Sequence, residues 1–179
     1  WKFYDDAGRI KTSATYKNNK LEGERITYYE NGSKNTVMDV KNEKRVGEEK
    51  QFYNFNQVYS IRTFDANGVE NGPATYFHQI GTVSHKFNVV NEKINGTFEE
   101  FYPNGKLKIK KTFVNGIVEG EQIGYFENGE IWKKGSFVKG NPHGEWFFYH
   151  ENGKLESSGM FKDGLRIGVW KVYRENGNI

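Results

Sequence analysis

Glycine recurs at a nearly fixed interval along this chain of 179 residues. The recurring glycines are Gly23, Gly47, Gly72, Gly96, Gly120, Gly144 and Gly168, 24 residues apart except for one interval of 25. A period of this length is typical of repeat proteins, in which each repeat is one small supersecondary unit. We therefore predict one continuous array, with repeats at 1–22, 23–46, 47–71, 72–95, 96–119, 120–143, 144–167 and a partial repeat at 168–179.

Each repeat has the pattern of a β-hairpin. In the repeat that Gly144 is expected to open, an aromatic residue follows at Tyr149, the pair Asn-Gly at 152–153, and apolar residues at Leu155 and Phe161. Asn-Gly between two such runs predicts a type I′ turn, in which both central residues have positive φ. The predicted fold class is all-β: an elongated, single-layer antiparallel sheet of tandem 24-residue β-hairpin repeats.

The second, third and fourth repeats depart most from this pattern. Lys34 replaces an aliphatic residue, Asn56 replaces a turn glycine, and one residue is inserted between Phe64 and Gly68. Asparagine enters the left-handed region more readily than most residues, so Asn56 is expected to serve in place of glycine. We expect the local turn geometry to change at these positions.

The repeat consensus resembles a known family. The sequence GEWFFYHENGKLESSGMFKDGLRIG at 144–168 is similar to the MORN repeat, and more closely to the bacterial MORN variant of the YwqK-family antitoxins. This resemblance implies an elongated hairpin array that serves as a binding or scaffolding module. The register begins two residues before Trp1, so we expect further repeats on both sides of this sequence.

The composition excludes several classes of protein. Apolar residues make up 35%, below the usual value of about 45–50%, which does not suit a thick core. Aromatic residues make up 16%, which does not suit disorder. The net charge of +3 comes from interleaved charges without a basic block, which argues against nucleic acid as a partner. Without cysteine, the chain does not fix a compartment, although a secreted, cell-surface or periplasmic location is favoured over a cytoplasmic one.

No catalytic constellation is recognisable in the sequence. The histidines have no metal-ligand spacing, and the recurrent acidic residues before the turns are interpreted as solvating the turns or as pairing with lysine across the hairpin. We predict no catalytic residue, no cofactor and no metal. If the chain were an enzyme, its site would lie at 47–95, where the repeat is least regular, with Arg62, His78 and His85 as the first candidates.

Large aromatic residues also occupy even-numbered positions after the repeat glycine. If both strands of a hairpin share one register, these residues lie opposite the apolar face formed by the odd positions. Exposed aromatic side chains would suit a binding surface, whereas a sheet that wraps would simply bury them. The candidate binding residues are Tyr29, Tyr53, Tyr76, Tyr102, Phe126, Trp146, Phe148 and Trp170.

The sequence therefore favours a non-catalytic scaffold whose aromatic face binds a protein partner. Three other interpretations stay open: a module that binds carbohydrate or cell-wall glycan, a protein that contacts anionic lipid, and an antitoxin-like protein. Self-association through the ends of the array is a further expectation, because edge strands expose unpaired backbone groups.

Overall fold

The computed structural model describes residues 1–178, and its regular elements are all β-strands. The chain forms two compact parts, which we call the N-terminal half (residues 1–92) and the C-terminal half (from Lys93 onward). No helix in the described part of the chain is long and apolar enough to cross a membrane.

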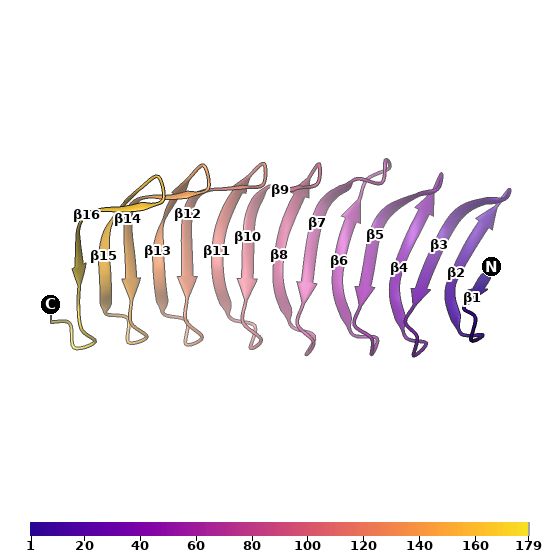
Figure 1. Cartoon of the computed structure of the whole chain (residues 1–179), viewed down its shortest axis with the longest axis horizontal. Coiled ribbons are helices and arrows are strands. Elements are labelled where there is room, and N and C mark those ends of the chain that lie inside the picture. The colour runs from indigo at the N-terminus through magenta and orange to yellow at the C-terminus, as the bar shows by residue number, and fades with distance from the viewer. Residues whose placement is uncertain (179) are drawn as a thin grey trace. The chain divides into compact units, whose positions relative to one another are not determined.

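In the N-terminal half, each strand pairs antiparallel with the next strand in the chain (Figure 1). The strands are β1 (Lys2–Tyr4), β2 (Ile10–Lys17), β3 (Lys20–Tyr28), β4 (Lys34–Lys41), β5 (Lys44–Phe52), β6 (Val58–Phe64), β7 (Glu70–Phe77) and β8 (Val83–Val90). This meander confirms the predicted tandem hairpins.

The C-terminal half repeats the same arrangement from β10 to β16. Its strands are β9 (Lys93–Ile94), β10 (Gly96–Phe101), β11 (Leu107–Val114), β12 (Ile117–Tyr125), β13 (Ile131–Val138), β14 (Asn141–Tyr149), β15 (Leu155–Lys162) and β16 (Leu165–Val172). The all-β, antiparallel fold class is therefore confirmed, whereas the prediction of a single continuous array stays a prediction.

The turns that contain the Asn-Gly pairs are not of the predicted type. The Gly32 amide donates to the Tyr29 carbonyl at 2.9 Å, and Gly32 has a φ of +82°, whereas Asn31 has no positive φ. This is the pattern of a type I turn followed by a left-handed glycine. Asn56 adopts a φ of +63° at the glycine position, as predicted.

Type I′ geometry occurs instead at the second turn of the repeat. Asn115 and Gly116 both have positive φ, at +52° and +84°. The inserted residue of the third repeat changes this turn: the Gly68 amide donates to the Asp65 carbonyl at 3.0 Å, so the turn resembles the first turns. The expected change in turn geometry is thus confirmed at this position, but it is wrong for Lys34 and Asn56, whose turns keep the ordinary bonds of the first turn.

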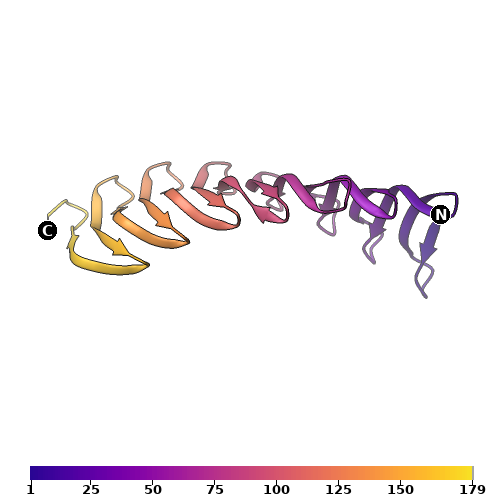
Figure 2. The same ribbon diagram turned by 90° about the horizontal axis from the view of Figure 1, so that it is seen from above.

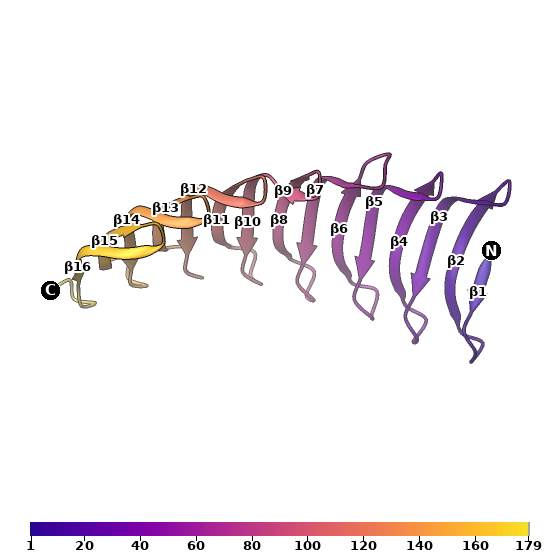
Figure 3. The same cartoon turned by 45° about the horizontal axis from the view of Figure 1, so that its top comes forward.

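Six of the seven repeat glycines lie inside strands and do not open them, contrary to the sequence interpretation, whereas Gly96 opens β10 as expected. Gly144 lies within β14 and has a φ of +77°, and Gly23 lies within β3 at +109°. Such values favour glycine and break the regular pleat. In the C-terminal half the strands turn through a bend near these positions (Figure 2 and Figure 3).

The assumed common register of the two strands is also wrong. Trp146 lies opposite Gly159, and Phe147 lies opposite Ser158, so an even position in the first strand faces an odd position in the second. Trp146 therefore shares a face with Phe161, whereas the prediction placed these residues on opposite faces. We call this the inner face; the other is the outer face.

The inner face carries the core. Ala14, Glu49 and Ala74 belong to one row of cross-strand partners that runs from β2 to β8, and the neighbouring row contains Phe64 and Val89. The buried residues other than glycine are Ala14, Val40, Glu49, Ser60, Phe64, Ala74, Val89, Gln122 and Trp146, all on this face. Because the sheet bends toward one side within each half, a single layer can bury its own apolar residues there.

Candidate functional site: an aromatic strip

Three of the predicted binding residues fasten one repeat to the next. Each of these tyrosines donates its hydroxyl hydrogen to a backbone carbonyl of the following repeat. The bonds join Tyr29 to Phe52 at 2.7 Å, Tyr53 to Phe77 at 2.9 Å, and Tyr102 to Tyr125 at 2.8 Å. His150 stands at the equivalent position, with its Nε2 atom 3.0 Å from the Tyr173 carbonyl oxygen. These hydroxyls therefore have a structural partner already.

The turn asparagines form a second link between repeats, which the sequence interpretation missed. The Asn128 Nδ2 atom donates to the Glu151 carbonyl at 2.9 Å, while its Oδ1 atom accepts from the Glu130 amide at 2.8 Å. Asn152 forms the same pair of bonds. The signal was present in the sequence, because a polar side chain that recurs with the repeat period can bond equivalently at every step.

Trp146, Phe148 and Trp170 are brought together in an aromatic cluster of the C-terminal half. Trp146 is only 4% exposed, and its ring centroid lies 5.3 Å from that of Phe137 and 5.8 Å from that of Phe161. The Trp146 Nε1 atom donates to the Ser136 carbonyl at 3.2 Å. The ring of Trp146 is therefore part of the core.

Phe126 begins the turn between β12 and β13, and its amide donates to the Glu130 carbonyl at 2.8 Å. Tyr76 lies instead in the N-terminal half, among other aromatic rings. The structure thus divides the predicted row into three tyrosines that bond to the next repeat, a packed cluster of three rings, one turn residue, and Tyr76 in a separate group of rings. Whether these side chains bind a partner stays a prediction.

A continuous series of rings runs from the turn after β5 to β8. We call it the aromatic strip; its members are Tyr53, Phe55, Tyr59, Tyr76, His85 and Phe87. Tyr53 stacks on Phe55 with centroids 5.6 Å apart, and Tyr76 stacks on His85 at 4.5 Å. Tyr59 bridges the two stacks, at 5.2 Å from Tyr53 and 5.6 Å from Tyr76.

Two rings of the strip are exposed, and the other four are half-buried. Phe55, in the turn between β5 and β6, is 54% exposed and Tyr59 is 39% exposed. Tyr76 lies deeper, and burial raises the pKa of its hydroxyl. The strip therefore offers two accessible rings that are held in place by four others.

A buried ion network lies beside the strip. Glu49, 3% exposed, accepts a hydrogen bond from Arg62, whose Nη1 atom is also 3.5 Å from Glu70. Burial alone would lower the pKa of Arg62, but the hydrogen bond to Glu49 and the charges of both carboxylates raise it. The guanidinium of Arg45 lies 4.0 Å from the Phe64 ring centroid. These paired charges fix the sheet that carries the strip.

The residues considered for catalysis do not assemble into a reactive site. Arg62 is committed to its two carboxylates, His85 stacks within the strip, and the His78 amide closes a turn with Thr82 at 2.8 Å. In residues 1–178 no group of three or more His, Cys, Asp or Glu residues could hold a metal ion.

The C-terminal half fills the position of Tyr59 differently. Lys108 stands there in one repeat, and its Nζ atom lies 2.7 Å from Glu100. In the next repeat Trp132 stands there and covers Gly124. The strip is therefore not a property of every repeat.

These bends, turns and repeated hydrogen bonds define a β-hairpin repeat protein. Four segments match the MORN repeat variant, at residues 21–42, 94–115, 118–139 and 142–163. Segments similar to this repeat thus occur in both halves. A search of curated proteins found no match to the chain. The aromatic strip lies entirely between the first and second matched segments.

Proposed function

We propose that this protein is a non-catalytic interaction module and that a protein partner binds the aromatic strip. One observation carries the proposal: six rings form an unbroken series where the chain departs from the repeat pattern, and the rings at one end are exposed. Tyr53 recurs with the period as a link between repeats, whereas Phe55 and His85 have no aromatic counterpart at their positions in the other repeats.

The chemistry of the strip suits a protein surface. Tyrosine and phenylalanine are enriched in the buried centres of interfaces, because they bury much area at a small cost in side-chain entropy. Phe55 and Tyr59 supply that area, and the stacks beneath them reduce the ordering needed on binding.

The ring geometry is less suited to sugar. Stacking on a sugar needs a free aromatic face, but Tyr53 and Phe55 lie face to face with an interplanar angle of 3°. Tyr76 and His85 likewise cover one another at 14°. The resemblance to YwqK-family antitoxins suggests a toxin as one such protein partner.

The test compares two double variants of matched chemistry. F55A/Y59A removes the exposed rings of the strip, whereas Y4A/Y16A removes two exposed rings elsewhere in the N-terminal half. Each variant is first checked by circular dichroism and thermal unfolding. Proteins captured from native extracts are identified by mass spectrometry, purified, and titrated against each variant by calorimetry.

A purified partner that binds the wild type and Y4A/Y16A but loses at least about tenfold in affinity for F55A/Y59A, which equals 1.4 kcal/mol, supports the proposal. Equal affinity for all three proteins would contradict it. Glycan-array binding that F55A/Y59A abolishes, without any protein partner, would favour the carbohydrate interpretation instead.

A further inference from the structure

Four lysines lie at two neighbouring hairpin tips on the upper edge of the N-terminal half in Figure 1. Lys17 lies directly opposite Lys20 across the turn between β2 and β3. Lys41 lies directly opposite Lys44 across the turn between β4 and β5. All four side chains are exposed, and we call them the lysine edge.

The arrangement is unfavourable for the isolated protein. Like charges placed directly opposite each other on neighbouring strands destabilise a sheet. Among the described residues, none of the four lysines forms an ion pair, and the nearby Glu22 and Glu43 do not pair with them. Two adjacent hairpins therefore each carry a pair of opposed lysines that no ion pair in the described part of the chain neutralises.

The corresponding tips of the C-terminal half do not share this feature. There the opposed residues are Val114 with Ile117, Val138 with Asn141, and Lys162 with Leu165. The hairpin can thus close with apolar or mixed pairs, and turn formation does not require opposed lysines.

We propose that the lysine edge binds an extended acidic segment of a polypeptide. The four lysines come from consecutive strands, and three steps of about 4.8 Å between strands spread them over about 14 Å. An extended chain of about four residues spans the same length at about 3.4 Å per residue. Acidic side chains along one such segment would reach both lysine pairs at once.

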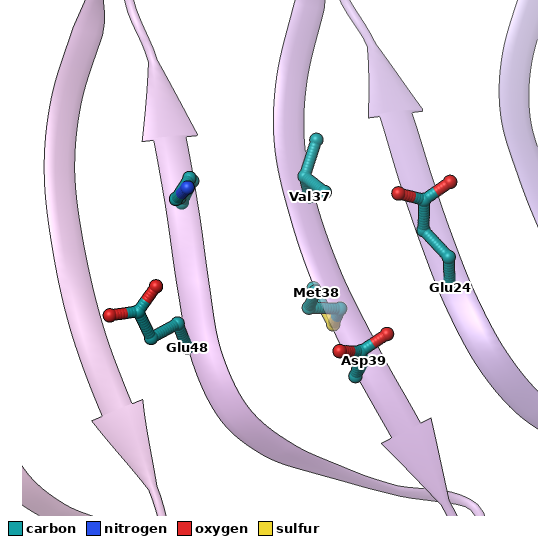
Figure 4. A pocket seen from close by; sticks show the side chains of 6 residues that line it. Glu24, Val37, Met38, Asp39 and Glu48 are labelled. Carbon is teal, nitrogen blue, oxygen red and sulfur yellow. The ribbon is translucent and has the colours of Figure 1, made fainter.

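An acidic hollow restricts how wide the ligand can be. Glu24, Asp39 and Glu48 lie with Lys50 around a hollow on β3 to β5, a few residues from the lysine edge (Figure 4). A bilayer surface or a nucleic-acid duplex that reached the lysines would also press its negative charge against these carboxylates. A single extended strand contacts the tips alone, so the hollow favours a narrow polyanion over a broad one.

The experiment measures binding of a dye-labelled peptide of ten glutamates by fluorescence anisotropy at low salt, with a ten-glutamine peptide as the reference. The test variant is K17Q/K20Q/K41Q/K44Q. The control variant, K110Q/K139Q/K162Q/K171Q, removes four exposed lysines of the C-terminal half. Both variants change the formal net charge from +3 to −1, so a difference between them reports the arrangement of charge.

We expect the test variant to bind the glutamate peptide about tenfold more weakly than the control variant, with affinity that falls as salt rises. The test variant should unfold at the same or a higher temperature, because the opposed charges are gone. Equal losses in both variants would show a net-charge effect and overturn the proposal. Binding to phosphatidylserine vesicles or duplex DNA that depends on the lysine edge, without binding to the peptide, would also overturn it.

Discussion

Gly135 and Trp146 provide a sharp test of how the repeats stack. The indole of Trp146 lies flat against Gly135, where an added Cβ would overlap the ring, and the same relation joins Trp170 to Gly159. Gly135 has no positive φ, so Gly135→Ala introduces a steric conflict without backbone strain. Phe137 and Phe161 meet the ring edge to face, and they restrict its movement.

The magnitude follows from this confinement. Overpacking of a core typically costs about 1–3 kcal/mol, and the direct overlap with a restrained ring places Gly135→Ala near 3 kcal/mol. Trp146→Ala should cost about 3–5 kcal/mol, because a large buried side chain is lost. With the indole absent, Gly135→Ala should become neutral or stabilise by about 0.4–1 kcal/mol, because alanine restricts the unfolded chain. The expected coupling between the two sites is therefore about 3 kcal/mol.

A double-mutant cycle measures this coupling by urea unfolding, followed by circular dichroism, of the wild type, both single variants and G135A/W146A. Gly159→Ala provides a second reading, and it should cost less because Trp170 is less buried than Trp146. A coupling below about 0.5 kcal/mol, within the error of additive effects, would refute the stacking of the indole on Gly135.

Three further predictions concern polar contacts. Tyr102→Phe should lower the free energy of unfolding by about 1 kcal/mol, the net value of one hydrogen bond, in urea titrations. Glu49→Ala should lower the free energy of unfolding by about 3 kcal/mol, which is the low end for breaking a buried pair because Glu70 still faces Arg62. The double variant E49L/R62M should regain most of that stability. Burial lowers the pKa of Lys133 in the folded protein below its usual value of 10.5. The charged side chain therefore destabilises the folded state at neutral pH, and this destabilisation disappears as the pH rises toward 10.5 and Lys133 loses its proton. Lys133→Met should therefore be more stable than the wild type at pH 7, by a margin that narrows at high pH in thermal unfolding.

The sequence predicted the hairpin array because the period and the turn residues are local signals. The aromatic, Asn-Gly and aliphatic positions of each repeat fall where strands and turns were expected. The type of turn could not be predicted from the Asn-Gly pair alone, because type I with a left-handed glycine and type I′ accept the same residues. The two turns of the repeat in fact divide these types between them, as Gly32 and Gly116 show.

The candidate site was only partly predictable, for a physical reason. Tyr53 and Tyr76 were among the predicted residues, whereas Phe55 and Tyr59 were not, because a strip is a set of contacts between strands. Which side chains meet depends on the register, and the turn between the strands shifts the register by one residue. That shift moves a whole row of side chains to the other face of the sheet.

The last prediction concerns the strand register. Because the sequence contains no cysteine, only the two introduced thiols can form a disulfide. Phe147 and Ser158 are direct cross-strand partners on the outer face, so F147C/S158C should form a disulfide on mild oxidation. The side chain of Ser157 emerges on the inner face opposite Phe148, so F147C/S157C should keep both thiols. Thiol titration in denaturant after oxidation of the folded protein measures both results. If F147C/S157C closes and F147C/S158C does not, then the register of β14 and β15 is shifted by one residue, and Trp146 does not share a face with Phe161.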